Sequence, residues 1–140
     1  MDEKNEKKPK IVSLIPIFPP LPIRTEADAI ESFARYHRRA GYRILKQAKL
    51  QFGTVDLAMI SPQNELFLVE FKMSAGANEI AHALGQILLY REQVNTTKFV
   101  KVHSIIRIVN LLPKKIYKFL YNVCSKYGVE LMASTEEEAT

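Results

Sequence analysis

The chain has 140 residues, of which 47% are apolar and 25% are charged, a balance and a length that fit one globular domain. Its formal net charge of +5 is uneven, with five basic and three acidic residues in 1–24, 15 and 9 in 25–133, and three glutamates in 134–140. The single Cys124 excludes a disulfide framework and a cysteine-based zinc site, and no apolar run reaches the ~18 residues of a membrane helix. We therefore expect an intracellular, cytoplasmic protein whose partner is anionic and not a membrane.

The first 24 residues differ in composition from the rest of the chain. Residues 1–10 are charged and are expected to be a flexible tail. Residues 11–24 are apolar but contain four prolines, which cannot donate to a sheet, so an extended arm is expected. This apolar arm is expected to pack either on the chain's own domain or on a second copy of the chain, and the second case would make a homodimer. With residues 134–140 as an acidic, disordered tail, the domain is expected to span 25–133.

A helix is predicted at the start of this domain, followed by three strands. Thr25 is a favourable N-cap, Asp28 stands where a capping box places its acid, and Gly41 ends the helix. Its apolar face repeats at helical spacing through Ile30, Phe33, Ala34 and His37. The three predicted strands are 42–50, 54–60 and 65–72, and the second and third are joined by a tight turn, PQNE.

The second half of the domain alternates helices and strands. Its elements are a helix over 78–93, a strand over 104–112 with a short piece at 98–102, a helix opened by Pro113 and lined by Tyr117, Leu120, Tyr121 and Cys124, and a strand over 129–132. The order αβββαβαβ predicts an α/β (α+β) fold with a mixed central sheet flanked by helices.

Three ionisable residues lie on two otherwise apolar strands. Asp56 stands in TVDLAMI, and Glu70 and Lys72 end the run ELFLVEFK on one strand face. A buried charge costs several kcal/mol unless it is paired or metal-bound, and an antiparallel hairpin brings Asp56 beside Glu70. Two neighbouring carboxylates repel unless a cation lies between them, and oxygen ligands favour Mg²⁺ or Mn²⁺. The alternative is structural, with Asp56 capping a turn and Glu70 paired with Lys72.

These residues resemble the motif of the PD-(D/E)XK nuclease superfamily, the restriction-endonuclease-like fold of Holliday-junction resolvases and RecB-like nucleases. The match is Val55-Asp56 followed by Glu70-Phe71-Lys72, with Val55 in place of the leading proline, and the resemblance covers about residues 25–132. It implies that Asp56, Glu70 and the Phe71 carbonyl bind the metal and that Lys72 positions or activates the attacking water.

The resemblance extends to both neighbouring helices. The family often places a metal-facing Glu on the first helix, where Glu26 is favoured over Glu31 because it shares the stripe that faces the sheet. On the second helix, Gln86 and Tyr90 resemble the Q-x-x-x-Y motif of RecB-like members. They continue a polar ridge through Asn78 and His82, for which a solvated helix face is the alternative.

The sequence therefore predicts a metal-dependent nuclease acting on DNA, in repair or recombination, without an organic cofactor. The residues expected to contact nucleic acid are His82 and the basic Arg35, Arg38, Arg39, Lys114, Lys115 and Lys118, although plain surface charge is an alternative for each. Two other functions stay open. One is a catalytically inactive nucleic-acid-binding or scaffold protein with the same fold, and the other is an RNase.

Overall fold

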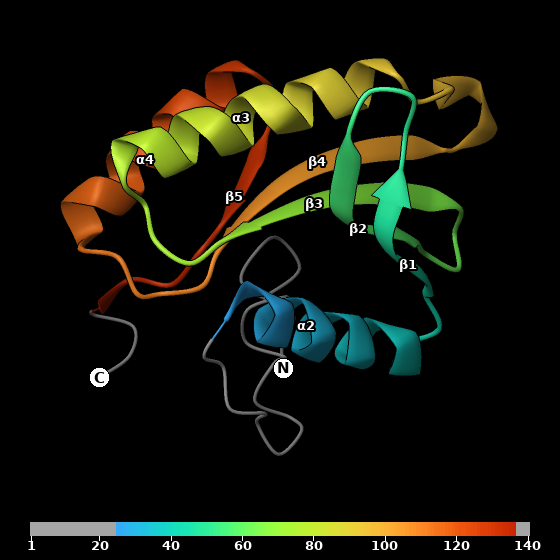
Figure 1. Cartoon of the computed structure of the whole chain (residues 1–140), viewed down its shortest axis with the longest axis horizontal. Coiled ribbons are helices and arrows are strands. Elements are labelled where there is room, and N and C mark those ends of the chain that lie inside the picture. Colours follow the sequence, from blue (N-terminus) through green and yellow to red (C-terminus); the bar gives the residue numbers. More distant parts are fainter. Residues whose placement is uncertain (1–24, 137–140) are drawn as a thin grey trace.

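The computed structural model describes residues 25–136, which form a single sheet with helices on both faces (Figure 1). The elements in chain order are α2 (Glu26–Arg39), β1 (Arg43–Lys49), β2 (Thr54–Ile60), β3 (Glu65–Lys72), α3 (Ala77–Glu92), the short 3-10 helix η3 (Thr96–Lys98), β4 (Lys101–Ile108), α4 (Lys114–Lys126) and β5 (Glu130–Met132). Apart from η3, this is the predicted αβββαβαβ order. The predicted tail and proline-rich arm, 1–24, lie outside the described residues.

The sheet is mixed, as predicted, with the strand order β1-β2-β3-β4-β5. The first three strands pair antiparallel, whereas β3, β4 and β5 are parallel because a helix connects each of them to the next. Figure 1 shows α3 and α4 on one side of the sheet and α2 on the other. The strand β3 is therefore central in the sheet and covered on both faces.

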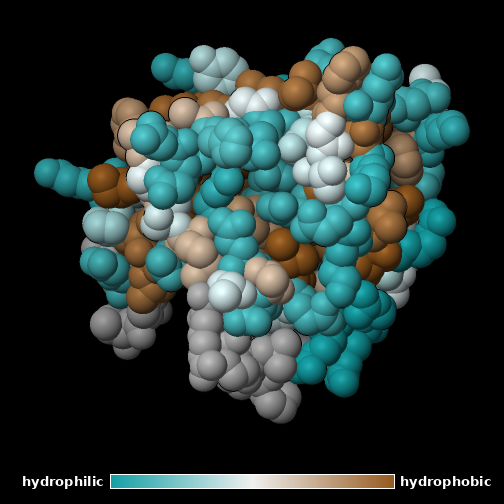
Figure 2. Space-filling view, viewed as in Figure 1, coloured by the Kyte–Doolittle hydropathy of each residue, from teal (hydrophilic) through white to brown (hydrophobic). Residues whose placement is uncertain are grey.

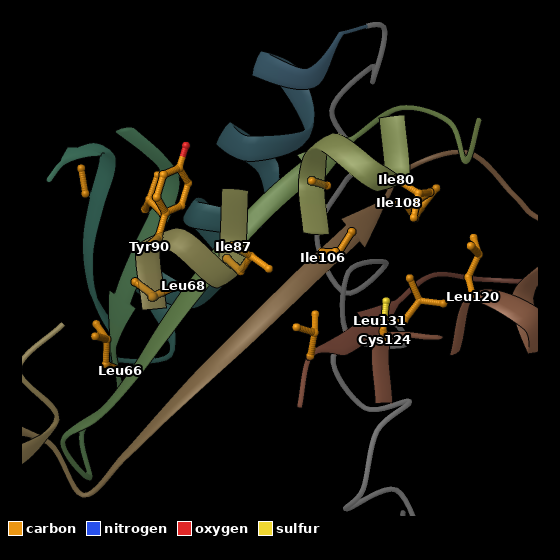
Figure 3. Close-up of a cluster of buried hydrophobic side chains, with 14 of the residues drawn as sticks. Leu66, Leu68, Ile80, Ile87, Tyr90, Ile106, Ile108, Leu120, Cys124 and Leu131 are labelled. Carbon is orange, nitrogen blue, oxygen red and sulfur yellow. The ribbon is translucent and has the colours of Figure 1, made fainter. Parts of the chain in front are cut away.

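Each face of the sheet has its own hydrophobic cluster. On the α2 face, Leu57, Val69 and Phe71 pack against Phe33. The opposite cluster takes Leu66 and Leu68 from β3 and joins them to side chains of α3, α4 and β5. In Figure 3 the Tyr90 ring lies at one end of this second cluster, with its hydroxyl pointing away from the other labelled side chains.

The helix and strand boundaries near the carboxylates agree with prediction. The Thr25 hydroxyl accepts a hydrogen bond from the Asp28 N–H at 3.1 Å, which caps α2. Gly41 follows the helix with a φ of 93°, the left-handed conformation that glycine favours at this position. Both β2 and β3 have their predicted bounds.

Three predictions in the second half of the domain were wrong in detail. The predicted strand 104–112 is the single strand β4, which begins and ends earlier because its parallel pairing runs from Glu65↔Lys101 to Lys72↔Ile108. Pro113 is the N-cap of α4 and not its first residue. Tyr121, predicted to line the packed face of α4, is 49% exposed.

The chain remains packed a few residues past the predicted end of the domain. Thr135 is buried and forms an isolated parallel bridge with Leu112. The Glu136 N–H donates to the Leu112 carbonyl at 3.0 Å. The segment predicted as an acidic tail is therefore anchored as far as Glu136, and residues 137–140 lie outside the described residues.

Figure 2 shows one face of the molecule, on which hydrophobic side chains form patches between larger hydrophilic areas. Within residues 25–136, no helix is both long enough and apolar enough to cross a membrane.

Candidate active site

Asp56 and Glu70 meet where the backbone ladder between β2 and β3 ends. The last ladder pair is Leu57↔Val69, and one further step along both strands brings Asp56 opposite Glu70. Here each carboxylate binds the backbone of the other strand. The Asp56 N–H donates to Glu70 Oε1 at 3.0 Å, and the Phe71 N–H donates to Asp56 Oδ2 at 2.9 Å.

This crossed arrangement holds both carboxylates in place and leaves part of each one free. Within residues 25–136, Asp56 Oδ1 and Glu70 Oε2 accept no hydrogen bond. The side chains that carry these two oxygens are held by neighbouring backbone groups of adjacent strands. The site therefore presents two fixed carboxyl groups that still have coordinating capacity.

Burial makes the charged form of this pair unfavourable. Glu70 is only 2% exposed, and burial is the main reason that its pKa is raised to about 7. The negative charges of Asp56 and Glu26 raise the Glu70 pKa further, while the Asp56 N–H and the Lys72 charge lower it. The Asp56 pKa is also raised by burial, against the opposing effects of the Phe71 N–H and Lys72.

Lys72 places a positive charge near Asp56 and Glu70 but forms no ion pair with either carboxylate. Its charge lowers the pKa of both Asp56 and Glu70. The side chain is half-buried, and in the described part of the chain it forms no ion pair within 4.0 Å. Its ammonium group is therefore available for another anion, which does not fit the structural alternative of a Glu70–Lys72 ion pair.

The two glutamates considered on the first helix lie in different surroundings. Glu26, at the start of α2, is close enough for its charge to raise the pKa of Glu70. Glu31 instead forms an exposed ion pair with Lys46 of β1. Of the two candidates, Glu26 is therefore the one that acts electrostatically on Glu70.

Gln86 and Tyr90 of α3 border the site together. Gln86 Nε2 donates to the Tyr90 hydroxyl at 3.2 Å, and the buried Gln86 Oε1 has no partner within the described residues. Burial raises the pKa of Tyr90, and the charges of Glu70 and Asp56 raise it further. The other ridge members, Asn78 and His82, are exposed, as the alternative of a solvated helix face predicts for these two positions.

Gly53 contributes to the site, although the sequence by itself indicates only a turn at this glycine. It has a φ of 105°, and a Cβ placed on it would lie 2.5 Å from Tyr90 Cε1. The turn before β2 thus holds the Tyr90 ring at close range. A glycine directly before a carboxylate strand was the available signal, but its contact with Tyr90 comes from tertiary packing.

The donor set fits a hard divalent cation held by two protein carboxylates. Within residues 25–136, no three His, Cys, Asp or Glu side chains form a metal-binding group, so Glu26 does not complete a three-residue set with Asp56 and Glu70. Mg²⁺ in particular is commonly bound through one or two carboxylates, with water and substrate oxygens as its other ligands. The two free carboxylate oxygens match that pattern.

Most residues predicted to contact nucleic acid are accessible. Arg38, Arg39 and the three α4 lysines are exposed, as is His82, while Arg35 is half-buried. The exposed side chains among them are accessible to a phosphate group.

Comparison with known proteins identifies the fold. No family model and no curated protein matches the chain. Among solved structures, a repair endonuclease from Pyrococcus abyssi matches with a TM-score of 0.57 and 13% identity, over 82% of this chain and 49% of that protein. The chain thus spans about half the length of that endonuclease, and at this identity the likeness shows a shared fold alone.

Two further solved structures match more weakly. One is an FdxN element excision controlling factor protein from Anabaena variabilis, with 17% identity and a TM-score of 0.44 over 72% of this chain and 84% of that one. The other is a XisH family protein from Nostoc punctiforme, with 13% identity and the same TM-score over 72% and 85%. The predicted fold class, an α/β fold with a mixed sheet between helices, is confirmed by the structure and the endonuclease match.

Proposed function

We propose that the chain is a divalent-metal-dependent nuclease that hydrolyses phosphodiester bonds in DNA. The observation that carries this proposal is the crossed pair Asp56 and Glu70, buried together with one free oxygen on each carboxylate. A fold without a cation-binding role would gain little from placing two carboxylates at such a position. The proposed function therefore explains an arrangement that is otherwise unfavourable.

The residues would divide the chemistry as follows. The free oxygens of Asp56 and Glu70, with the Phe71 carbonyl as a third ligand, would hold Mg²⁺ or Mn²⁺, which supplies acidification of water and neutralisation of phosphate charge. Lys72 donates hydrogen bonds to the attacking water or to a phosphate oxygen whose charge grows in the transition state. Glu26, whose charge acts on Glu70, would bind a second ion or orient water there.

Gln86 and Tyr90 restrict the positions of Lys72 and of the phosphate on the α3 side of the site. Their hydrogen bond fixes the Tyr90 hydroxyl near the carboxylates, and the unpartnered Gln86 Oε1 can accept a hydrogen bond from Lys72 or from water. We assign both residues to organising Lys72 and the phosphate. Tyr90→Phe should therefore reduce the cleavage rate less than Lys72→Met does.

DNA as the substrate is supported by charge and by fold. The domain is basic overall, which suits the phosphate backbone, and the P. abyssi protein with the same fold is described as a repair endonuclease. A homodimer that makes two symmetric cuts would suit the apolar arm of residues 11–24, and this oligomeric state stays a proposal.

A cleavage panel tests the proposed function. The full chain is incubated with single-stranded, duplex and branched DNA and with single-stranded RNA, each with Mg²⁺, Mn²⁺ or chelator. We expect metal-dependent cleavage of at least one DNA form, abolished in Asp56→Asn, Glu70→Gln and Lys72→Met. Glu92→Gln, an exposed change on α3, is the matched control and should cleave at the wild-type rate.

The same panel separates the two alternative functions. Binding of DNA without cleavage in any metal condition would indicate an inactive nucleic-acid-binding protein. Cleavage confined to RNA would indicate an RNase that uses the same site. Cleavage that survives Asp56→Asn and Glu70→Gln would refute the assignment of these carboxylates.

A further inference from the structure

Gln47 has a backbone conformation that is unusual for its position in β1. Its φ of 53° lies in the left-handed region, which is energetically unfavourable for a residue with a Cβ. The other non-glycine residue with positive φ in the described chain, Asn64, stands in the β2–β3 hairpin turn, where that conformation is ordinary. Gln47 instead stands in the middle of a strand.

The strained residue lies directly across from a proposed metal ligand. The β1–β2 register runs through Lys46↔Leu57 and resumes at Ala48↔Val55, which leaves Gln47 facing Asp56 at the one position that the ladder skips. On the other side of Asp56, the β2–β3 ladder has also ended. Asp56 is thus released from regular pairing on both sides.

The side chains of both strands change face at this point. In β2, Leu57 and Met59 belong to the cluster on the α2 face, but Val55, two residues before Leu57, belongs to the opposite cluster. In β1, Ile44 packs on the α2 face, whereas Ala48 packs on the α3 face with Val55. Regular alternation would keep residues two or four apart on one face, so both strands turn over at Gln47 and Asp56.

An apolar groove lies beside this change of face. The groove has a volume of about 440 Å³, and its lining includes Ala48 and Val55 together with Ala58, Leu66 and Leu68. These side chains therefore share one concave surface although they differ in strand parity. At the same point, the Asp56 carboxylate accepts a hydrogen bond from the Phe71 N–H of the adjacent strand.

We propose that Gln47 is a positioning residue, whose left-handed backbone turns β1 and β2 over and so places the Asp56 carboxylate against β3. The consequence for metal binding rests on the proposed function, whereas the placement of Asp56 does not. Gln47 contacts neither substrate nor metal in this account and acts through the backbone of Asp56.

Substitutions that differ in tolerance for positive φ test the backbone claim. Glycine and asparagine enter the left-handed region readily, and β-branched valine does not. We expect the urea midpoint of the full chain to rise or stay level in Gln47→Gly and Gln47→Asn and to fall in Gln47→Val. Lys49, exposed and regularly paired with Thr54, is the matched control, where Lys49→Gly should be less stable than Lys49→Val.

Two further measurements test the effect on Asp56. In metal-free protein, we expect the Asp56 and Phe71 amide protons to lose their protection from hydrogen exchange in Gln47→Val and to keep it in Gln47→Gly and in both Lys49 variants. Mn²⁺ affinity should fall about tenfold in Gln47→Val, the scale seen when a support of a metal ligand is removed, and recover in Gln47→Gly.

The outcomes distinguish this proposal from the proposed function. If Gln47→Gly destabilises the chain as much as Lys49→Gly, the proposal is overturned, even if Gln47→Val does not fold. Retention of both protected amides in a folded Gln47→Val also overturns it. Absence of Mn²⁺ binding in the wild type would refute the metal site and leave the amide result to decide the role of Gln47.

Discussion

Glu70, when ionised, lowers the stability of the folded chain. Its carboxyl group has an ordinary pKa of 4.5 and a raised value of about 7 in the folded chain, chiefly because of burial. The folded state therefore holds the proton more tightly than the unfolded state does. Ionisation of Glu70 between pH 4.5 and 7 reduces the free energy of unfolding, by an amount on the order of 3 kcal/mol when complete.

The first prediction is that Glu70→Gln stabilises the metal-free protein at high pH. Glutamine keeps an oxygen for the Asp56 N–H but carries no charge. In urea unfolding with chelator present, the variant should exceed the wild type by up to about 3 kcal/mol at pH 8, and by much less at pH 4. A difference that is the same at both values would contradict the raised pKa.

His37 also makes stability depend on pH, but with the opposite sign to Glu70. Comparing the wild type with Glu70→Gln removes the contribution of His37. Burial lowers the pKa of His37, whose Nδ1 lies 2.8 Å from the Phe33 carbonyl oxygen. Stability from His37 is therefore lost as the pH falls below about 6.5. Because wild type and Glu70→Gln both contain His37, its contribution cancels in their difference.

At the scale of elements, α3 and the turn before β2 support each other. The Tyr90 side chain is 4% exposed and packs so closely against residue 53 that only a glycine fits there. Gly53 also has a positive φ, which would be strained in a residue with a side chain. The turn leads directly into β2, which carries Asp56. The contact therefore links the Gln86–Tyr90 pair to the position of the carboxylate strand.

The second prediction follows from this contact. Gly53→Ala should lower the free energy of unfolding by about 1–3 kcal/mol, because it adds backbone strain and a clash with the Tyr90 ring. In a Tyr90→Ala background the same change should cost less, since only the backbone strain remains. Equal losses in the two backgrounds, measured by urea unfolding, would rule out the close contact.

The elements also differ in how far the sequence could predict them. The bounds of β2 follow from local signals, since Gly53 precedes it and Ser61-Pro62 follows it. The end of β4 does not, because the apolar run SIIRIVNLL continues past the last residue that pairs with β3. The end of β4 is set by its parallel pairing with β3, more than 30 residues earlier in the chain, and no local sequence pattern predicts such pairing.

The same distinction applies to the candidate site. The carboxylates were predictable because charged groups stand out in apolar strands. Gln47 was not, since glutamine carries no preference for the left-handed region and its exposed position looks ordinary in β1. Its role depends on pairing with β2, so it emerges only from the register of the folded sheet.

For the whole molecule, the charge distribution is the feature that bears on substrate binding. The described domain is basic, and its two proposed contact groups, one on α2 and one on α4, are mostly exposed. Surface cations gain affinity for nucleic acid by releasing counterions from phosphates, so that binding weakens as salt increases. The acidic site residues are local exceptions within this basic surface.

The third prediction concerns this salt dependence. The triple change Lys114→Gln, Lys115→Gln and Lys118→Gln should weaken duplex DNA binding and reduce the slope of log affinity against log salt by about 0.9 per lost phosphate contact. Fluorescence anisotropy with chelator present separates binding from cleavage. An unchanged slope would remove α4 from the proposed DNA surface, and changing Lys98, exposed on η3, is the control.

The central claim is that Asp56 and Glu70 form a divalent-cation site, and calorimetric titration of the full chain with Mn²⁺ at pH 8 tests it most directly. The wild type and the Glu92→Gln control should bind Mn²⁺ with the same affinity, because Glu92 is exposed on α3. Asp56→Asn and Glu70→Gln should each lose measurable binding while remaining folded, since each removes one of the two charged ligands. Undiminished Mn²⁺ binding in both variants, or no binding in the wild type, would contradict the claim.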